Sequence, residues 1–491
     1  MDLSDAQKYE ALRSGDSRFD GVFYICVLST GIYCRPICPA KTSKFKNCKF
    51  VKSAAEAEEQ GFRACLRCRP ESAPGSPAWL GTSASVNRAL RLISENNSNN
   101  QSIALLAEKL GMSERHLRRL FIKHIGASPQ AVIQASRFAT ARQLLRETNL
   151  KITEVAFASG FKSLRRFNDA IKKAYDISPS NFRKDIKISD SSKNLPSIEG
   201  QVKMRLRLGY RPPYQWDKLI SYFKMRAIDG VEYIKDNCYI RTVSLGTSVG
   251  VICVHQDIKK NQIVADFSFD EMVLAPNIIQ RLSDMFDLEM RPDIVTETLA
   301  KSPALAPKVK KSAGLRIPGT WDLYELCVRT IVGQQISVKG AITILGRLVD
   351  RLGREVSVGN GSASQLYRVF PRPDDLVNGD LNNLGLTKSR IRTLLNISRA
   401  FQADANFINT SLEYDEAYEK LISVAGIGPW TAQYIGLRGL RNPDAFPASD
   451  LVLLKATEAS SPVELLKAAQ VWRPWRGYAA IHLWNGEPTN G

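Results

Sequence analysis

The sequence lacks the features of a membrane protein or an exported protein. No apolar run in its 491 residues approaches the roughly 20 residues that a transmembrane helix needs. The opening segment also lacks a basic tip followed by an apolar stretch and a small-residue cleavage site, so no signal peptide is predicted. We therefore expect a cytoplasmic protein that has no membrane partner.

Acidic residues are scarce relative to basic ones. The chain has 68 Lys and Arg against 49 Asp and Glu, a formal net charge of +19. Residues 1–190 hold 31 basic and 18 acidic side chains, which is +13 and leaves +6 for the remainder. Such an excess of basic residues predicts a polyanionic partner. We expect residues 1–190 to make the larger contribution to salt-sensitive binding to phosphates. At about 100 to 200 residues per domain, the length predicts three or four domains.

Four of the nine cysteines are spaced as metal ligands. Three residues separate Cys34 from Cys38, two separate Cys65 from Cys68, and 26 residues lie between the two pairs. In a long chain without a signal peptide, such pairs indicate a tetrahedral Zn²⁺ site rather than disulfides. The spacing alone favours a purely structural zinc ribbon over a reactive site.

The residues around these cysteines change that preference. The runs TGIYCRPICPAK, from Thr30 to Lys41, and GFRACLRCRPE, from Gly61 to Glu71, resemble the N-terminal domain of the bacterial adaptive-response protein Ada. The resemblance implies that Cys34 takes a methyl group from a DNA phosphotriester. Methylation would remove one negative charge from the site and strengthen DNA binding. Candidate phosphate contacts surround the cysteines in sequence: Arg35, Lys41, Lys44, Lys46, Lys49, Arg63, Arg67 and Arg69.

Two helix-turn-helix patterns follow a turn-rich stretch, Ser72 to Ser85. Ile103–Phe121 and Lys151–Lys184 each carry a buried apolar stripe, a turn glycine and a serine cap, and the region resembles the AraC-type tandem helix-turn-helix domain. A connecting helix from about Val132 to Leu145 would hold the two units rigidly, each offering one helix to a major groove. The DNA-contacting candidates are Arg118, Arg119, Arg165 and Arg166.

A polar linker from about Ile186 to Gln201 precedes a change in composition. Alternating apolar segments between residues 202 and 267 predict a small sheet, and helical periodicity then runs from about Met272 to the C-terminus with short breaks. The run from Leu208 to Ile234 resembles the N-terminal α+β domain of alkylbase glycosylases. We thus predict a multidomain, mainly α chain with α+β parts: a zinc domain (1–75), a tandem helix-turn-helix (83–186), a small α+β domain (200–300) and a helix-hairpin-helix glycosylase domain (305–491).

The stretch from Leu421 to Asp450 contains the main functional motif of the second half of the chain. Helical patterns flank a Gly-Ile-Gly turn whose glycines, Gly426 and Gly428, would let backbone N–H groups approach a DNA phosphate. The hairpin alone also serves in proteins that only bind DNA. With GQQIS (333–337), PDAFPASD ending in Asp450, and WRPWRGYAAIHLW (472–484), it resembles the helix-hairpin-helix glycosylases typified by 3-methyladenine DNA glycosylase II. That resemblance makes Asp450 the catalytic carboxylate.

The chemistry fits an aromatic base pocket. Alkylated purines such as 3-methyladenine and 7-methylguanine are cationic, so Trp430, Tyr434 and Trp484 could hold one by cation–π attraction after it is flipped from the duplex. The alternative is that these aromatics are core residues. Gln335 and Ile336 match the family's wedge, which fills the space that the flipped base leaves in the DNA duplex. The sequence does not assign which of the two side chains enters the duplex.

Several absences narrow the predicted reaction. Relatives that also cleave the DNA strand carry a lysine where this chain has Trp430, so no Schiff-base chemistry is expected. No cysteine follows Cys327, which excludes the iron-sulfur loop of some relatives, and no PCHR-like alkylguanine-repair motif is present. Leu451 replaces a tyrosine of close relatives, so the base preference stays open.

The sequence therefore predicts a fusion with two activities. A zinc-dependent, self-methylating transcription regulator precedes a monofunctional glycosylase that hydrolyses the N-glycosidic bond of alkylated bases. We expect a monomer whose partners are double-stranded DNA, both alkylated and promoter, and RNA polymerase. The alternatives are a regulator whose glycosylase half only binds DNA, and a zinc site that is inert structure.

Overall fold

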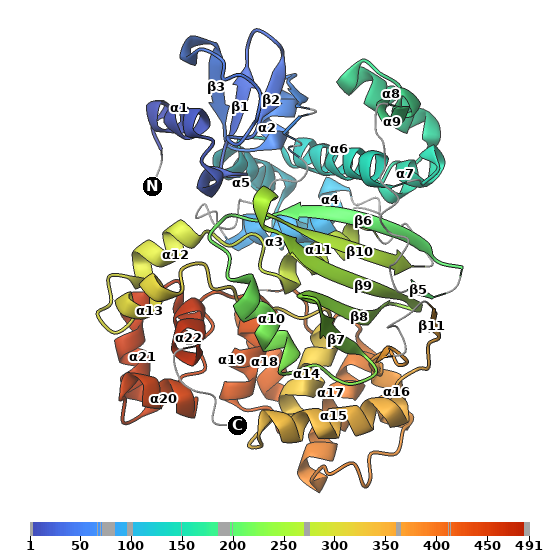
Figure 1. Cartoon of the computed structure of the whole chain (residues 1–491), viewed down its shortest axis with the longest axis vertical. Coiled ribbons are helices and arrows are strands. Elements are labelled where there is room, and N and C mark those ends of the chain that lie inside the picture. Colours follow the sequence, from blue (N-terminus) through green and yellow to red (C-terminus); the bar gives the residue numbers. More distant parts are fainter. Residues whose placement is uncertain are drawn as a thin grey trace.

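Four structural parts follow one another along the chain and stack into one body. The computed structural model describes residues 3–65, 67–68, 70, 84–95, 102–148, 150–184, 197–198, 200–269, 275–359, 365–410, 412 and 414–485. The zinc-binding part and the helix-turn-helix part lie side by side at one end, a sheet lies in the middle, and the C-terminal helices form the other end (Figure 1). The stretch 72–83 and most of the linker predicted at 186–201 lie outside the described residues.

The first part is a small sheet with a helix on each side. Its strands are β1 (Tyr24–Val27), β2 (Ile32–Cys34), β3 (Cys48–Val51) and β4 (Arg63–Ala64), in the order β3-β1-β2-β4. The parallel pair β2 and β4 brings the two cysteine pairs to the same end of the sheet. Helices α1 (Asp5–Ser14) and α2 (Ala54–Glu59) complete this part.

The second part contains the two predicted helix-turn-helix units. Ser113 and Ser163 cap the second helix of each unit by accepting hydrogen bonds from backbone N–H groups, and Gly111 and Gly160 turn with positive φ, as expected. The predicted connecting helix is the 19-residue α6. The helices are α3 (Ala84–Glu95), α4 (Ile103–Lys109), α5 (Glu114–Ile125), α6 (Pro129–Glu147), α7 (Ile152–Ala158), α8 (Leu164–Tyr175) and α9 (Pro179–Lys184).

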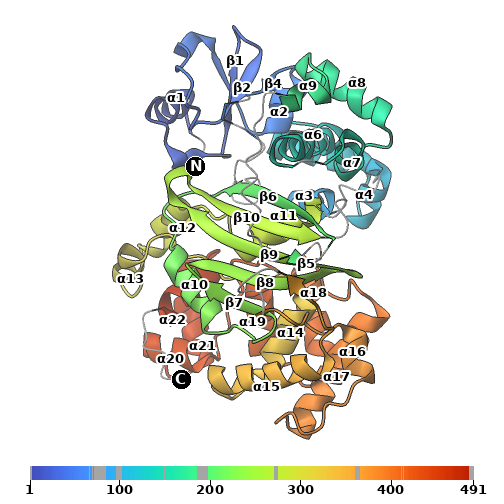
Figure 2. The ribbon, with the colours of Figure 1, turned by 45° about the vertical axis from the view of Figure 1, so that its right-hand side comes forward.

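The third part is an antiparallel sheet of five strands in the order β6-β10-β9-β8-β7, visible in the middle of Figure 2. The alternating segments at 202–208, 239–243, 250–255 and 263–267 that predicted this sheet fall within β6, β8, β9 and β10, whereas β7 was not predicted. The strands are β6 (Val202–Gly209), β7 (Glu232–Lys235), β8 (Cys238–Leu245), β9 (Ser248–Asp257) and β10 (Gln262–Phe269), with α10 (Trp216–Lys224) and α11 (Ala275–Met285).

The described residues of the C-terminal part are mainly helical. Strand β11 (Val358–Gly359) pairs with β5 (Ser197–Ile198), so two residues of the predicted linker belong to a two-stranded sheet. None of the described helices combines the length and apolarity that crossing a bilayer requires. The helices are α12 (Pro292–Leu299), α13 (Ala306–Lys311), α14 (Leu323–Val332), α15 (Val338–Leu352), α16 (Pro373–Asn378), α17 (Lys388–Ala403), α18 (Tyr414–Ser423), α19 (Pro429–Arg438), α20 (Leu451–Thr457), α21 (Pro462–Ala468) and α22 (Arg476–Trp484).

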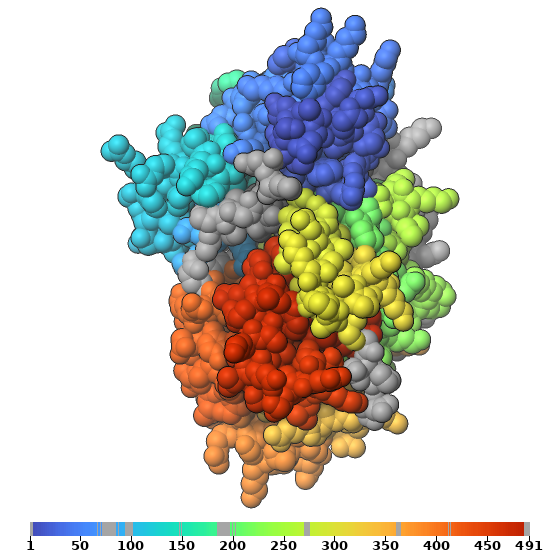
Figure 3. All heavy atoms as spheres, turned by 90° about the vertical axis from the view of Figure 1, so that its left-hand side faces the viewer, coloured from blue at the N-terminus to red at the C-terminus, as the bar shows by residue number. Residues whose placement is uncertain are grey.

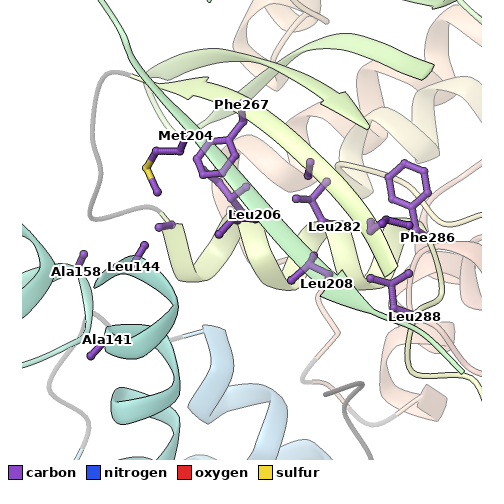
Figure 4. Packing of buried hydrophobic residues seen from close by; sticks show 14 of the residues in the cluster. Ala141, Leu144, Ala158, Met204, Leu206, Leu208, Phe267, Leu282, Phe286 and Leu288 are labelled. Atoms are coloured by element: carbon purple, nitrogen blue, oxygen red, sulfur yellow. The ribbon is translucent and has the colours of Figure 1, made fainter. Parts of the chain in front are cut away.

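One apolar core crosses the boundary between the two halves. Buried side chains of α6 and α7 belong to the same cluster as those of β6 and α11, and α6 packs against β6. Figure 4 shows Leu144 and Ala158 beside Met204, with Leu206 and Leu282 further along the same cluster. The helix-turn-helix part is therefore packed on the central sheet and is not merely tethered to it.

Candidate active site and metal centre

The four predicted ligand cysteines come together at one end of the first sheet. The sulfurs of Cys34, Cys38, Cys65 and Cys68 all lie within 4.8 Å of one another, and the Cys38 and Cys65 sulfurs are 3.9 Å apart. Four thiolates around a zinc ion at about 2.3 Å would be spaced by about 3.8 Å. The donor set and its spacing therefore fit Zn²⁺.

Arg35, which follows Cys34, forms hydrogen bonds to this cluster from the protein interior. Its backbone N–H donates to the Cys68 sulfur at 3.3 Å, and its Nη1 donates to the Cys68 carbonyl at 2.9 Å. The guanidinium also pairs with Asp20, with Nε to Oδ1 at 2.7 Å, and only 6 % of Arg35 and 2 % of Asp20 is exposed. The prediction that Arg35 contacts phosphate is wrong, because its side chain is buried and paired.

The other predicted phosphate contacts around the cluster are at the surface. The side chains of Lys41, Lys44, Lys46, Lys49, Arg63 and Arg67 are exposed, whereas Arg69 lies outside the described residues. Their exposure leaves them available to DNA and is equally compatible with solvated charge.

Tyr33, which precedes Cys34, connects the zinc-binding part to the helix-turn-helix part. The Tyr33 hydroxyl donates to Glu58 Oε1 at 2.8 Å, and the same oxygen accepts from Arg142 Nη1 of α6 at 3.1 Å. Arg142 is 1 % exposed and also donates to the hydroxyl of Tyr175, the last residue of α8. A partly buried chain of polar contacts thus runs from the cysteine strand to the second helix-turn-helix unit.

The predicted DNA-contacting arginines lie on the exposed faces of α5 and α8. Arg118 and Arg119 are exposed on α5, and Arg165 and Arg166 are exposed on α8. The apolar faces of both helices are buried, with Leu117 and Phe167 fully enclosed. Each unit therefore presents a basic helix face to solvent.

The hairpin between α18 and α19 has the predicted glycine turn, and its two glycines differ. Gly426 has φ +97°, and a Cβ there would lie 1.9 Å from Thr393 Oγ1, so the fold itself demands glycine. Gly428 caps α19 with an ordinary φ of −94°, and a Cβ there would meet nothing within 4 Å. Gly428 thus leaves open space at the helix N-terminus.

The predicted wedge loop is fastened to this hairpin. Gln334 Nε2 donates to the Gly426 carbonyl at 3.3 Å and to Thr431 Oγ1 at 3.0 Å. Gln335 is exposed, and its backbone has φ +54°, a conformation that residues other than glycine rarely adopt. Ile336 is half-buried. The loop and the hairpin therefore form one surface.

Asp450 lies at the N-terminus of α20 and accepts four hydrogen bonds. Its Oδ2 accepts from the indole N–H of Trp430 at 2.9 Å. Its Oδ1 accepts from the indole N–H of Trp484 at 3.0 Å and from the backbone N–H groups of Val452 and Leu453, both at 3.1 Å. The carboxylate is half-buried and held in one orientation by residues of three helices.

Two of the three predicted pocket aromatics, Trp430 and Trp484, contact this carboxylate, and the third, Tyr434, lies against both of their rings. Trp430 and Tyr434 stack with ring centroids 5.1 Å apart and an interplanar angle of 13°, and Trp484 lies 6.1 Å from Tyr434 at 59°. All three side chains are half-buried, which differs from the full enclosure expected of core residues. The sequence did not predict Tyr222 of α10, whose hydroxyl lies 2.9 Å from that of Tyr434.

Comparison with known proteins identifies the two halves. A Mycobacterium tuberculosis protein described as a probable bifunctional transcriptional activator/DNA repair enzyme AlkA is 38% identical over 482 residues, 97% of this chain and 95% of that protein. The chain belongs to this family of bifunctional activators and repair enzymes. Family models match in order: the metal binding domain of Ada at residues 7–71, a helix-turn-helix domain at 106–185, and the AlkA N-terminal domain at 205–322.

The second half has further relatives. DNA-3-methyladenine glycosylase 2 of Escherichia coli is 30% identical over 283 residues, 57% of this chain and 96% of that enzyme. The structure of a 3-methyladenine DNA-glycosylase from Archaeoglobus fulgidus covers 57% of this chain with a TM-score of 0.50 at 19% identity, which supports the fold.

Family membership confirms the predicted fold class and the pairing of an Ada-type regulatory part with a 3-methyladenine glycosylase part. The bifunctional enzyme carries its four-cysteine cluster within the Ada metal-binding domain, consistent with zinc. DNA is the partner of its helix-turn-helix and glycosylase parts. The domain boundaries and the roles of individual site residues stay predictions.

Proposed function

We propose that the C-terminal half excises alkylated bases by hydrolysis, with Asp450 as the catalytic carboxylate. The observation that carries this proposal is the four-donor environment of Asp450 beside the Trp430, Tyr434 and Trp484 rings. A carboxylate so oriented can stabilise the positive charge that develops on the deoxyribose or orient a water for attack. The electron-rich rings would hold a cationic base such as 3-methyladenine or 7-methylguanine.

The hairpin and the wedge loop would hold the DNA for this reaction. Gly428 leaves space for a phosphate at the N-terminus of α19, where backbone N–H groups point outward. Gln335 and Ile336, fastened beside the hairpin through Gln334, would fill the gap left by the flipped base. Which of these two side chains enters the duplex would follow from replacing each with alanine.

The test is release of free bases from methylated duplex DNA by the full chain and by Asp450→Asn. Release of 3-methyladenine or 7-methylguanine that falls at least about 100-fold in the variant is the expected result. Base release by Asp450→Asn at the wild-type rate would remove Asp450 from its role. No release from either protein, with DNA binding intact, would support the alternative in which this half only binds DNA.

We propose that Cys34 is the methyl acceptor of the regulatory half. Its sulfur would attack the methyl carbon of a DNA methyl phosphotriester, forming the S–C bond while the C–O bond breaks and leaves a phosphodiester. Zinc, when bound, would keep the Cys34 thiol deprotonated at neutral pH. Exposed basic side chains around the half-buried Cys34 would bring the DNA backbone to it.

Labelled methyl transfer from methylated DNA to the wild-type chain and to Cys34→Ser tests this assignment. Loss of labelling in the variant is expected. Full labelling of Cys34→Ser would displace Cys34 as the acceptor, and absence of labelling in both chains would favour a structural zinc site.

We further propose that α5 and α8 read promoter DNA with Arg118, Arg119, Arg165 and Arg166, and that the methylated protein recruits RNA polymerase. Replacing the four arginines by glutamine should weaken binding to promoter DNA and reduce the salt dependence of binding. We also propose that the protein is a cytoplasmic monomer. Sedimentation velocity measurements at micromolar concentration test whether it is monomeric.

A further inference from the structure

The first turn of α17 lies against both the wedge loop (residues 333–337) and the hairpin. Arg390, in this turn, donates a hydrogen bond from its guanidinium to the backbone carbonyl of Gln334 in the wedge loop. Thr393, one helical turn further along, is buried against Gly426 of the hairpin, where its Oγ1 would lie 1.9 Å from an added Cβ. One helix therefore contacts both elements that we propose to hold the DNA.

The carbonyl that Arg390 binds belongs to the peptide that precedes Gln335. This peptide is planar and joins the Gln334 carbonyl to the Gln335 N–H, so any rotation of the plane changes φ of Gln335. Gln335 has φ +54°, and a residue other than glycine keeps such a conformation only where its surroundings enforce it. The Arg390 guanidinium holds one end of the peptide whose rotation would release this conformation.

The other hydrogen bonds of the wedge loop do not reach this peptide. The side chain of Gln334 donates to the Gly426 carbonyl at 3.3 Å and to Thr431 Oγ1 at 3.0 Å. Ser337 caps α15 by accepting from the Gly340 N–H at 3.1 Å. In the described part of the chain, the Arg390 guanidinium is the one group bonded to the Gln334 carbonyl.

The surroundings of Arg390 differ from those of its basic neighbours. Lys388 and Arg392 are exposed on α17 and available to DNA phosphates, whereas Arg390 is half-buried. The backbone N–H of Arg390 donates to Thr387 Oγ1 at 3.3 Å, which fixes the start of the helix. A half-buried guanidinium that already binds a carbonyl is better placed to hold the loop than to contact DNA.

We propose that Arg390 positions the wedge loop for base flipping; this inference rests on the proposed glycosylase function. With the Gln334 carbonyl held, Gln335 keeps its positive φ, and Gln335 and Ile336 meet the duplex in one fixed direction. A wedge that is ordered before binding loses less conformational entropy when it enters the duplex. Without the guanidinium, the peptide would rotate, Gln335 would adopt a negative φ, and the wedge would turn away from the gap.

The experiment measures base flipping and base release separately with the full chain. Flipping is followed by the fluorescence of 2-aminopurine placed beside 7-methylguanine in a duplex, and release is measured under single-turnover conditions. Arg390→Met keeps the apolar stem and removes the donors. The flipped fraction at saturating protein and the rate of 7-methylguanine release should both fall about tenfold, as for the loss of a hydrogen bond from a charged group.

Two further variants connect this loss to the strained residue. Gln335→Gly removes the cost of a positive φ, so adding Arg390→Met in that background should lower the flipped fraction only about twofold. Arg399→Met is the matched control, because Arg399 is exposed on the same helix three turns away from the loop, and it should leave flipping unchanged.

A direct contact between Arg390 and a DNA phosphate is the competing role. Loss of a phosphate contact reduces the slope of log binding constant against log salt concentration by about one, whereas loss of a positioning residue leaves that slope unchanged. A reduced slope in Arg390→Met, or an undiminished tenfold loss in the Gln335→Gly background, would overturn the proposal. A wild-type flipped fraction in Arg390→Met would overturn it as well.

Failure of the proposed glycosylase function would look different. In that case the wild-type chain would release no base, whatever the state of Arg390. The fluorescence of 2-aminopurine would still compare flipping by the wild-type chain with flipping by Arg390→Met, so the role of Arg390 is tested independently of base release.

Discussion

The side chain of Asp20 pairs with Arg35, while the backbone carbonyl of Asp20 accepts a hydrogen bond from Arg211 Nε at 2.8 Å. Arg35 directly follows Cys34, and Arg211 belongs to the glycosylase half, where it is fully buried. One residue therefore joins the metal centre to the repair enzyme. The space-filling view shows the first part (dark blue) resting on the yellow segment that includes α12 (Figure 3).

Replacing Asp20 should destabilise the zinc-binding part. Asp20→Ala leaves the Arg35 guanidinium buried without its carboxylate, which should lower the free energy of unfolding by about 3 to 5 kcal/mol. Chemical unfolding and the rate of zinc loss to a chelator measure the effect. Glu10→Gln, which breaks the exposed pair with Arg13, should cost less than about 1 kcal/mol. Equal costs for the two variants would contradict the role of the buried pair.

Glu58 should be needed to hold the helix-turn-helix part against the zinc-binding part. Glu58→Ala removes the acceptor of Tyr33 and Arg142, so we expect a stability loss of about 3 kcal/mol and weaker promoter binding. Glu10→Gln is the matched control, because it breaks an exposed pair with Arg13 within α1, away from this interface. Unfolding curves and DNA titrations at fixed salt compare them. A Glu58→Ala protein as stable as the control would refute this link.

The two hairpin glycines should respond differently to alanine. Gly426→Ala places a methyl group against Thr393 with strained φ, so it should lower the thermal stability of the chain and lesion binding together. Gly428→Ala meets no protein atom and should leave stability within about 0.5 kcal/mol while still weakening DNA binding by crowding the phosphate. Differential calorimetry and binding to an abasic-site duplex separate the two effects.

His482 should make stability depend on pH. Burial lowers the pKa of His482 from its ordinary 6.5 to about 4, so the unfolded chain binds more protons between these values. The contribution of neutral His482 to the free energy of unfolding is fully present above pH 6.5. It falls as the pH drops toward 4, by about 3 kcal/mol in total. His482→Phe should flatten the slope of unfolding free energy against pH in that window. An unchanged slope would show that His482 titrates normally in the folded chain.

Features with local signals were predictable from the sequence. The helix-turn-helix units follow from apolar periodicity and the Ser113 and Ser163 caps, and the cysteine spacing indicated a cluster that the fold brings together. Strands β6, β8, β9 and β10 alternate strongly enough to be found. Strands β5 and β11 have two residues each, which is too short for any alternating pattern.

Contacts between distant residues left no such signal. Tyr222 and Tyr434 are 212 residues apart, and α10 reaches the pocket only because the central sheet packs beside the C-terminal helices. Arg35 is one of several basic residues near the cysteines in the sequence, and no local pattern indicates that Asp20 is its partner. Burial decided the role of Arg35, and burial depends on tertiary packing.

The apolar core shared by α6, α7, β6 and α11 has a consequence for how the chain could be divided. A single proteolytic cut between residues 185 and 196 would break the covalent connection but leave this core in place. The two fragments should then remain associated and migrate together on gel filtration, since separating them would expose Leu144, Met204 and Leu206 to water. Either half produced alone would carry this apolar surface uncovered, which predicts poorer solubility than that of the intact chain.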